Sequence, residues 1–212
     1  ERSDMRAFLA RVTRMVKVPL MIDSTDADVI EESLTWCQGK AILNSINLED
    51  GLDRFERVVP LARRFGAALV VGCIDEKGMA QTAERKAEIA RRTVAIAKDY
   101  GIPPDSLVFD ALTCTLATGG EEDRRSAIET LEGIRRIKAE NPGVLTVLGV
   151  SNVSFGLAKH AREVVNSVFL YHAVQAGLDL AIVNPKDIRA YPQIAEEERL
   201  LADVLARLGE DG

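Results

Sequence analysis

Residues 67–73 read Ala67-Ala68-Leu69-Val70-Val71-Gly72-Cys73, an almost continuous apolar run of strand length. A strand with one face in water alternates apolar and polar residues, and this run does not alternate. We therefore expect a strand that is buried on both faces, as in parallel sheets covered by helices. Amphipathic helical patterns flank the run at residues 52–65, where Gly66 ends the helix, and at residues 87–97.

The same alternation of short apolar strands and helices extends along the chain. Further strands are predicted at residues 18–23, 41–44, 107–110, 144–150 and 178–183. Helices are predicted near residues 27–36, 128–137 and 161–176. A first helix, capped by Ser3 or Asp4, precedes them and has an apolar stripe of Met5, Phe8, Leu9, Val12, Met15 and Val16. A last helix follows them, with apolar Leu201, Val204, Leu205 and Leu208. Strand centres about 22–40 residues apart are typical of βα units, so the fold class is α/β with a parallel sheet.

Two architectures are compatible with six such strands. One is an open doubly wound sheet, and the other is a TIM (β/α)₈ barrel without its first two strands, since a complete barrel has about 250 residues. The helix that precedes the first strand favours the barrel, because a chain that begins at the second helix of a barrel has this order of elements. Periodicity alone does not separate the two.

Composition excludes several classes of partner. Of 212 residues, 27 are Lys or Arg and 33 are Asp or Glu, a net charge of −6. This acidic balance disfavours nucleic acid and anionic membranes, because both attract basic patches. No apolar run approaches the roughly 18–20 residues of a transmembrane helix. The widely spaced Cys37, Cys73 and Cys114 form no Cys-x-x-Cys pair, so we expect no bound metal, no disulfide framework and a reducing, cytoplasmic location.

Small polar or acidic residues follow most of the predicted strands. They are Asp23-Ser24, Asn44-Ser45, Asp75, Asp110, Ser151-Asn152 and Asn184. In parallel α/β folds the carboxyl ends of the strands face the ligand, so this ring is a candidate site, although each residue alone is also a good helix cap or turn residue. Asp and Asn offer fixed acceptors and donors, which suit a neutral heterocycle that carries N–H and C=O groups along its edge. The two histidines, His160 and His172, fall in helical sequence away from the strand ends.

Several of these residues belong to a recognisable pattern. Pro19–Ser24, Leu43–Ile46, Phe109-Asp110 and Leu148–Gly156 occur in an order and spacing that closely resemble the pterin-binding domain of cobalamin-dependent methionine synthases. The most specific element is Gly149-Val150-Ser151-Asn152-Val153-Ser154, and the resemblance runs from about residue 5 to residue 208. Corrinoid iron–sulfur protein methyltransferases are a near relative in this pattern and dihydropteroate synthases a more distant one.

The resemblance implies one domain over residues 1–212, a (β/α)₈ barrel of the pterin-binding type that supplies strands 3 to 8 and forms a fragment of a larger multidomain enzyme. It implies 5-methyltetrahydrofolate as substrate and transfer of the N5 methyl group to a Co(I) corrinoid, within methionine synthesis and one-carbon metabolism. The cobalamin would be carried by a separate domain or protein. The family barrel has two earlier strands that are absent here, one with Gly-Glu-Arg and a second with Asp-x-Asn, and an Asp or Asn of the second strand also contacts the pterin.

The resemblance also assigns roles to individual residues. Asp23, Asn44 and Asp110 match positions that hold the pterin by its edge, Asn152 matches an asparagine close to N5 with Gly149 and Ser151 beside it, and Asp75 is a weaker match. As the catalytic residue, Asn152 would present its amide carbonyl to a protonated N5 or its NH₂ group to a neutral N5, because an amide carries both an acceptor and donors. No catalytic acid is assigned.

Three other functions remain open. One is a folate- or pterin-binding module without catalysis, and a second is an enzyme like the corrinoid iron–sulfur protein methyltransferases. The third, an enzyme like dihydropteroate synthase, would need a Ser-Arg-Lys triplet late in the barrel, where this chain has Ser151-Asn152-Val153.

Overall fold

The computed structural model describes residues 2–117 and 121–207. The strands are β1 (Met21–Asp23), β2 (Ile42–Leu48), β3 (Ala68–Asp75), β4 (Gly78–Met79), β5 (Leu107–Asp110), β6 (Leu145–Gly149) and β7 (Leu180–Ile182). The helices are α1 (Arg2–Met15), α2 (Ala27–Leu34), α3 (Asp53–Phe65), α4 (Ala83–Asp99), α5 (Glu121–Glu140), α6 (Lys159–Gln175) and α7 (Glu196–Arg207). Four short 3₁₀ turns join them, η1 (Pro104–Ser106), η2 (Val150–Ser154), η3 (Pro185–Asp187) and η4 (Tyr191–Gln193).

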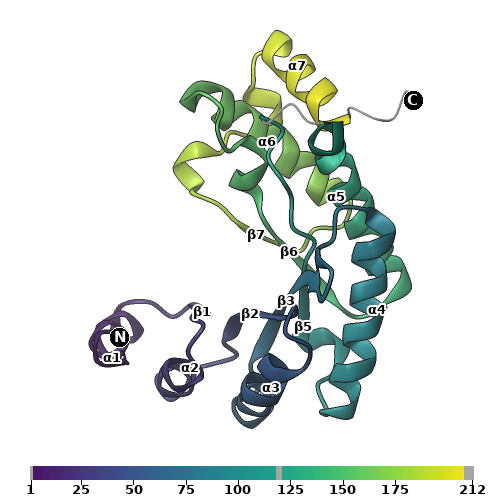
Figure 1. The fold of residues 1–212 in the computed structure, drawn as a ribbon. Helices are drawn as coiled ribbons and strands as arrows, with labels where there is room; N and C mark the ends of the chain where they lie inside the picture. Colours follow the sequence, from purple (N-terminus) through teal and green to yellow (C-terminus); the bar gives the residue numbers. More distant parts are fainter. Residues whose placement is uncertain (1, 118–120, 208–212) are drawn as a thin grey trace.

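Strand order identifies the architecture as a partial (β/α) barrel. The sheet runs β1-β2-β3-β5-β6-β7, with every neighbouring pair on this path parallel, so its order follows the chain without the reversal of a doubly wound sheet. The strands form an arc with the helices on its outer side, and the arc is open between β1 and β7 (Figure 1). The predicted parallel α/β fold is confirmed, and β4, an antiparallel partner of β3 that follows a turn at residues 76–77, was not predicted.

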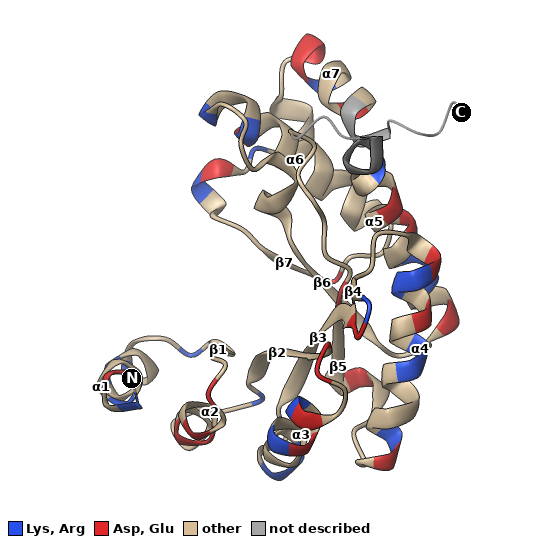
Figure 2. Cartoon of the chain, in the orientation of Figure 1, with Lys and Arg blue, Asp and Glu red and all other residues tan. Residues whose placement is uncertain are grey.

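Two apolar layers explain why residues 67–73 do not alternate. Leu69 and Val71 point outward into the large core under the helices, whereas Ala68 and Val70 point inward. The inner layer comprises Ala68, Val70, Val108 and Val147, with Met21, Ile42, Leu145 and Leu180 packed against it. Charged residues of both signs lie mainly on the outer helices, and the strands are mostly uncharged (Figure 2).

The first helix is present where predicted, but most of its predicted apolar stripe is not buried. Helix α1 begins at Arg2, so Ser3 and Asp4 lie inside it rather than capping it. Of its apolar stripe only Leu9 is buried, while Phe8 is 61% and Met15 is 82% exposed. The reason is position, because α1 lies at the edge of the arc and packs mainly against α2.

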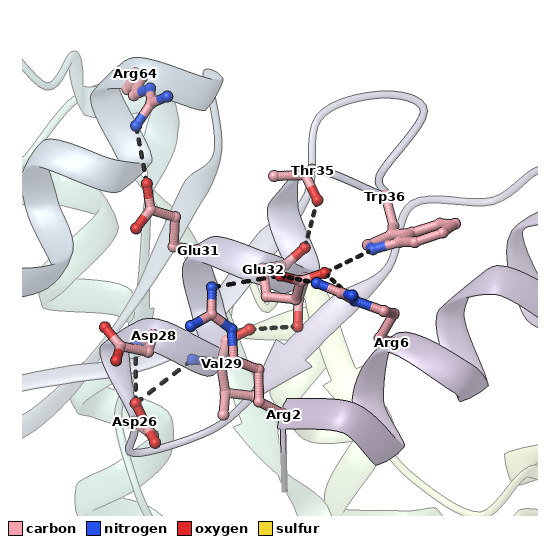
Figure 3. A network of polar contacts seen from close by, with 11 residues as sticks. Arg2, Arg6, Asp26, Asp28, Val29, Glu31, Glu32, Thr35, Trp36 and Arg64 are labelled. Atoms are coloured by element: carbon pink, nitrogen blue, oxygen red, sulfur yellow. Dashed lines mark hydrogen bonds and ion pairs between the residues drawn. The ribbon is translucent and has the colours of Figure 1, made fainter.

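A buried carboxylate fastens α1 to α2 (Figure 3). Glu32 accepts hydrogen bonds from Arg6 Nε and Nη2 at 2.8 and 3.0 Å, from Trp36 Nε1 at 3.2 Å and from Arg2 at 3.4 Å. The hydrogen bonds from Arg6 and Trp36 lower the pKa of Glu32 to about 2. These contacts are charge-assisted and therefore stronger than those between neutral groups.

The last helix differs from prediction in the same way as the first. Leu201 is 70% and Val204 is 59% exposed, whereas Ala202 is buried. Helix α7 packs against α6 and α5, so these contacts turn a different face inward. Leu208 lies outside the described residues, as does the side chain of Leu205.

Candidate functional site

Side-chain parity decides which strand-end residues face the inside of the arc. Successive residues of a strand point to opposite faces, so a residue two positions after an inward one also points inward. Met21, Ile42, Val108 and Val147 belong to the inner layer. The residues two positions later are Asp23, Asn44, Asp110 and Gly149. Asp23, Asp110 and Gly149 are the last residues of their strands, whereas Asn44 is the third residue of β2. The structure therefore brings these four predicted site residues to one face.

Asp23 and Asn44 form a pair across β1 and β2. They are register partners, and they line a common pocket of about 330 Å³ together with Ser24, Ser45 and Arg54. Arg54, on α3, donates to the backbone oxygens of Ser24 at 2.8 Å and Ser45 at 3.4 Å, and also to that of Thr25. A single guanidinium therefore ties together the loops that follow both strands.

Asn47 is an inward residue that sequence reasoning missed. The ladder between β2 and β3 shifts register between Leu43 and Ile46, next to a cis peptide bond between Asn44 and Ser45. Ile46 and Leu48 point into the outer core, so Asn47, which lies between them, points to the inner face. A Cβ placed on Gly72 of the neighbouring strand would lie 3.9 Å from the Cβ of Asn47. A bulge of this kind leaves no reliable sequence signal.

Asp110 lies half-buried on β5, opposite Gly72 of β3. Its Oδ1 accepts a hydrogen bond from the Leu112 amide at 2.9 Å. Burial raises the pKa of Asp110 to about 6, against the opposing effects of that hydrogen bond and of the positive charge of Lys86. An unpaired carboxylate with a raised pKa on the inner face is typical of a functional position.

Asp75 is not part of this group. It ends β3 on the outer parity, where Cys73 also points, and it is 5% exposed. Its carboxylate forms an ion pair with Arg85 of α4, lies 4.0 Å from Arg92 and accepts from the Lys77 amide at 3.0 Å. This placement corrects the expectation that Asp75 belongs to the ring of strand-end residues. Asp75 lies three residues after Gly72, which is on the inner face, and an odd spacing along a strand places a side chain on the opposite face.

Gly149, Ser151 and Asn152 form the β6 end of the site. The chain turns into η2 after Gly149, which leaves Ser151 and Asn152 exposed. A Cβ placed on Gly149 would lie 3.4 Å from Nδ2 of Asn152, so the glycine leaves room for the amide. Buried Ser154 anchors the turn through a 2.7 Å hydrogen bond with Asn166 Oδ1.

Two of the pockets at this end of the barrel are lined by predicted site residues. Ser151 lines a second pocket of about 500 Å³ with Arg162 and Asn166 of α6. Asp110 and Asn152 line neither this pocket nor the one at Asp23. The loop after β5 nevertheless contacts η2 directly, because the Leu116 amide donates to the Val153 carbonyl at 2.9 Å.

Other candidate residues have structural partners. Asn184 caps η3, accepting from the Lys186 amide at 3.3 Å and donating to Asp187 at 2.8 Å. His172 binds Asp203 at 2.7 Å between α6 and α7. His160, which has no obvious partner in the sequence, binds Glu198 of α7 at 2.6 Å.

The cysteines are free thiols, and burial raises the pKa of Cys73 to about 12. Within residues 2–117 and 121–207, no cluster of three His, Cys, Asp or Glu side chains is arranged to hold a metal ion. In the same part of the chain no helix has the length and apolar character needed to cross a membrane.

Comparison with known proteins identifies relatives of this arrangement. The sequence family described as pterin binding enzyme matches residues 1–184. Methionine synthase of Mycobacterium tuberculosis (strain ATCC 25618 / H37Rv) is 44% identical over 204 residues, and that of Mycobacterium leprae (strain TN) is 42% identical over 204 residues. Each alignment covers 94% of this chain but 17% of the relative, so the chain spans about a sixth of the length of these relatives.

Solved structures with a similar fold include dihydropteroate synthases. That of Xanthomonas albilineans, in complex with 7,8-dihydropteroate, has a TM-score of 0.62 at 15% identity, over 93% of this chain and 69% of that chain. That of Thermus thermophilus, in complex with 6HMPPP, has a TM-score of 0.57 at 23% identity, over 96% and 72%. At these identities the likeness establishes the fold alone, which is that of a barrel.

Proposed function

The chain belongs to the pterin binding enzyme family, and from this premise we propose that it binds 5-methyltetrahydrofolate and supports transfer of the N5 methyl group to a Co(I) corrinoid. The corrinoid partner is a cobalamin-binding domain or protein outside this chain, and the reaction is the methyl transfer of methionine synthesis from homocysteine in the cytoplasm. Identity of 44% to a methionine synthase over nearly the whole chain supports this choice.

The single observation that carries the proposal is the common inward face of Asp23, Asn44 and Asp110. The edge of a pterin ring presents N–H donors beside a carbonyl acceptor. Carboxylates accept such donors, and an amide matches either kind of group. A ligand without these donors would leave the carboxyl group of Asp110 desolvated and unpaired, which selects against other heterocycles.

Asn152 is proposed to act on N5 of the substrate. A tertiary amine is a poor leaving group, so N5 must gain a proton or a hydrogen bond as its bond to the methyl carbon breaks. The amide of Asn152 can accept from a protonated N5 or donate to a neutral one, and it therefore stabilises both states. Gly149 and Ser151 complete the backbone around this amide. Asp75, which is paired with Arg85 on the outer face, is not included in the proposed binding set.

The corrinoid supplies the cobalt nucleophile that accepts the methyl group. The contribution of this chain is to bind the pterin, to orient N5 toward the open carboxyl end of the strands and to stabilise the amine that is released. No metal ligand is required from this chain for these tasks.

Calorimetric titration with 5-methyltetrahydrofolate tests the proposal. We expect saturable binding by the chain and a large loss of affinity in Asp110→Ala, with circular dichroism to confirm that both are folded. Asp105→Ala is the matched control, because Asp105 lies in η1 at the amino end of the same strand. Added cob(I)alamin then distinguishes the two leading functions. Methyl transfer supports the enzyme, binding without transfer supports a pterin-binding module, and absence of binding by a folded chain contradicts the proposal.

A further inference from the structure

Lys86 of α4 is a buried cation that the proposed function has not used. It is 3% exposed, and its ammonium group donates to the backbone oxygens of Ala80 at 2.9 Å, Ala111 at 2.5 Å and Leu112 at 3.0 Å. In the described part of the chain no carboxylate is hydrogen-bonded to it. Removing an ammonium group from water is energetically unfavourable, so a buried lysine usually has a structural or functional role.

The position is built to accommodate this side chain. Gly133 of α5 faces the lysine stem, and a Cβ placed there would lie 2.6 Å from Cδ of Lys86. A glycine in the interior of a helix is less favourable than alanine. The crossing of α4 and α5 therefore leaves space for Lys86 at the expense of helix stability.

Two of the three carbonyls, those of Ala111 and Leu112, belong to the segment that follows Asp110. Leu112 has a φ of 53°, which is unfavourable for a residue with a side chain and persists only where neighbouring groups hold it. Its carbonyl accepts from Lys86 and from Thr130 Oγ1 at 2.8 Å, while its amide donates to Asp110 Oδ1 at 2.9 Å. Leu112 thus links the ammonium group directly to the carboxylate.

We infer that Lys86 is a positioning residue of the pterin site, which fixes the Ala111–Leu112 turn and through it the orientation of the Asp110 carboxylate. This inference rests on the proposed function, because it assumes that Asp110 binds the pterin. The lysine acts through the turn and does not touch the ligand itself.

Charge adds to this effect. The titratable groups around Lys86 are Cys73 of β3, Asp110 of β5, Cys114 of the following loop and Glu129 of α5. Glu129 is engaged with the Ala83 amide at 2.7 Å, and burial keeps Cys73 protonated. Of the four, Asp110 is the group that the Leu112 amide joins to the lysine-bound turn, and the charge of Lys86 opposes the rise of the Asp110 pKa.

The test compares Lys86→Met, which keeps the stem but removes the charge, with Gly133→Ala, which keeps the charge but displaces the stem. Lys138→Met is the control, because Lys138 also donates to a backbone oxygen, that of Val144, but it lies in the last turn of α5 and pairs with Asp179 instead of holding the Asp110 turn. The readouts are the pKa of the Asp110 carboxyl, from carbon-13 NMR of the ligand-free chain, and the affinity for 5-methyltetrahydrofolate.

We expect Lys86→Met to raise the Asp110 pKa by about half a pH unit or more. It should also weaken binding at least about tenfold, mainly because the Ala111–Leu112 turn is no longer held in place and the carboxylate loses its orientation. Gly133→Ala should weaken binding of 5-methyltetrahydrofolate with a smaller change in the Asp110 pKa than Lys86→Met causes. If Lys86→Met does not fold, Gly133→Ala alone tests whether Lys86 positions Asp110. An unchanged pKa and affinity in both folded variants overturns the inference. If the unmodified chain binds no folate, the proposed function fails, and the NMR titration still decides whether Lys86 controls Asp110.

Discussion

Asp75 and Asp110 end adjacent strands of the sheet, yet their side chains leave it on opposite faces. Asp110 is the register partner of Gly72, on the inner parity, whereas Asp75 lies three residues beyond Gly72 and reaches Arg85 on α4. Two aspartates that look equivalent in sequence are therefore available for different tasks. One is presented to a ligand, and the other joins the strand to the helix that follows it.

This difference predicts opposite effects of the same substitution. Asp110→Asn should weaken binding of 5-methyltetrahydrofolate about 10- to 100-fold, because an ionic acceptor is lost. Asp75→Asn should leave the affinity nearly unchanged but lower the free energy of unfolding by about 1–3 kcal/mol, because Arg85 loses its partner. Calorimetry and urea denaturation on both variants measure the two quantities. Equal losses of affinity would show that Asp75 does contact the ligand.

The site is expected to reduce the stability of the protein. The pKa of Asp110 is raised from 3.8 to about 6, so between these pH values the folded chain binds more protons than the unfolded chain. Its contribution to the free energy of unfolding therefore decreases as pH rises through this window and stays low above it. Asp110→Asn should stabilise the ligand-free chain at pH 7 by up to about 3 kcal/mol. A stability no higher than that of the unmodified chain at pH 7 would contradict the raised pKa.

Asn152 is expected to affect the reaction more than binding. Asn152→Ala should slow methyl transfer to cob(I)alamin about 10- to 100-fold, because the hydrogen bond to N5 matters most as the methyl group leaves. The affinity for 5-methyltetrahydrofolate should change only severalfold. Asn184→Ala is the matched control, since that amide follows the next strand and caps η3. Single-turnover kinetics and calorimetry separate the two effects, and unchanged transfer in Asn152→Ala would remove this residue from the mechanism.

The α1–α2 contact should be sensitive to acid. The pKa of Glu32 is lowered to about 2, so the stability that it contributes is complete above its ordinary value of 4.5 and is lost as pH falls toward 2. Glu32→Gln should lower the melting temperature at pH 7 and flatten its dependence on pH below 4.5. Glu31→Gln is the control, because its pair with Arg64 is solvent-exposed and should contribute little. Thermal melts from pH 7 to pH 3 measure both, and parallel curves for the two variants would contradict the prediction.

The sequence by itself determined the alternation of strands and helices, the parallel α/β class and the family signature around Asn152. These features are local, because apolar runs, helical periodicity and short motifs depend only on residues that are close in the sequence. It also indicated Asp23 and Asp110, which end their strands, and Asn44, although β2 continues beyond Asn44 to Leu48.

Only the tertiary structure decided between an open sheet and a barrel, because strand order depends on pairing between distant segments. It also decided the faces of Asp75 and Asn47, since a shift of one residue in register reverses the side of the sheet to which a residue points. Lys86 reads in the sequence as an ordinary helix-surface lysine. It becomes part of the site because the packing of α4 on α5 places Gly133 against its stem and directs its ammonium group to carbonyls 25 and 26 residues away.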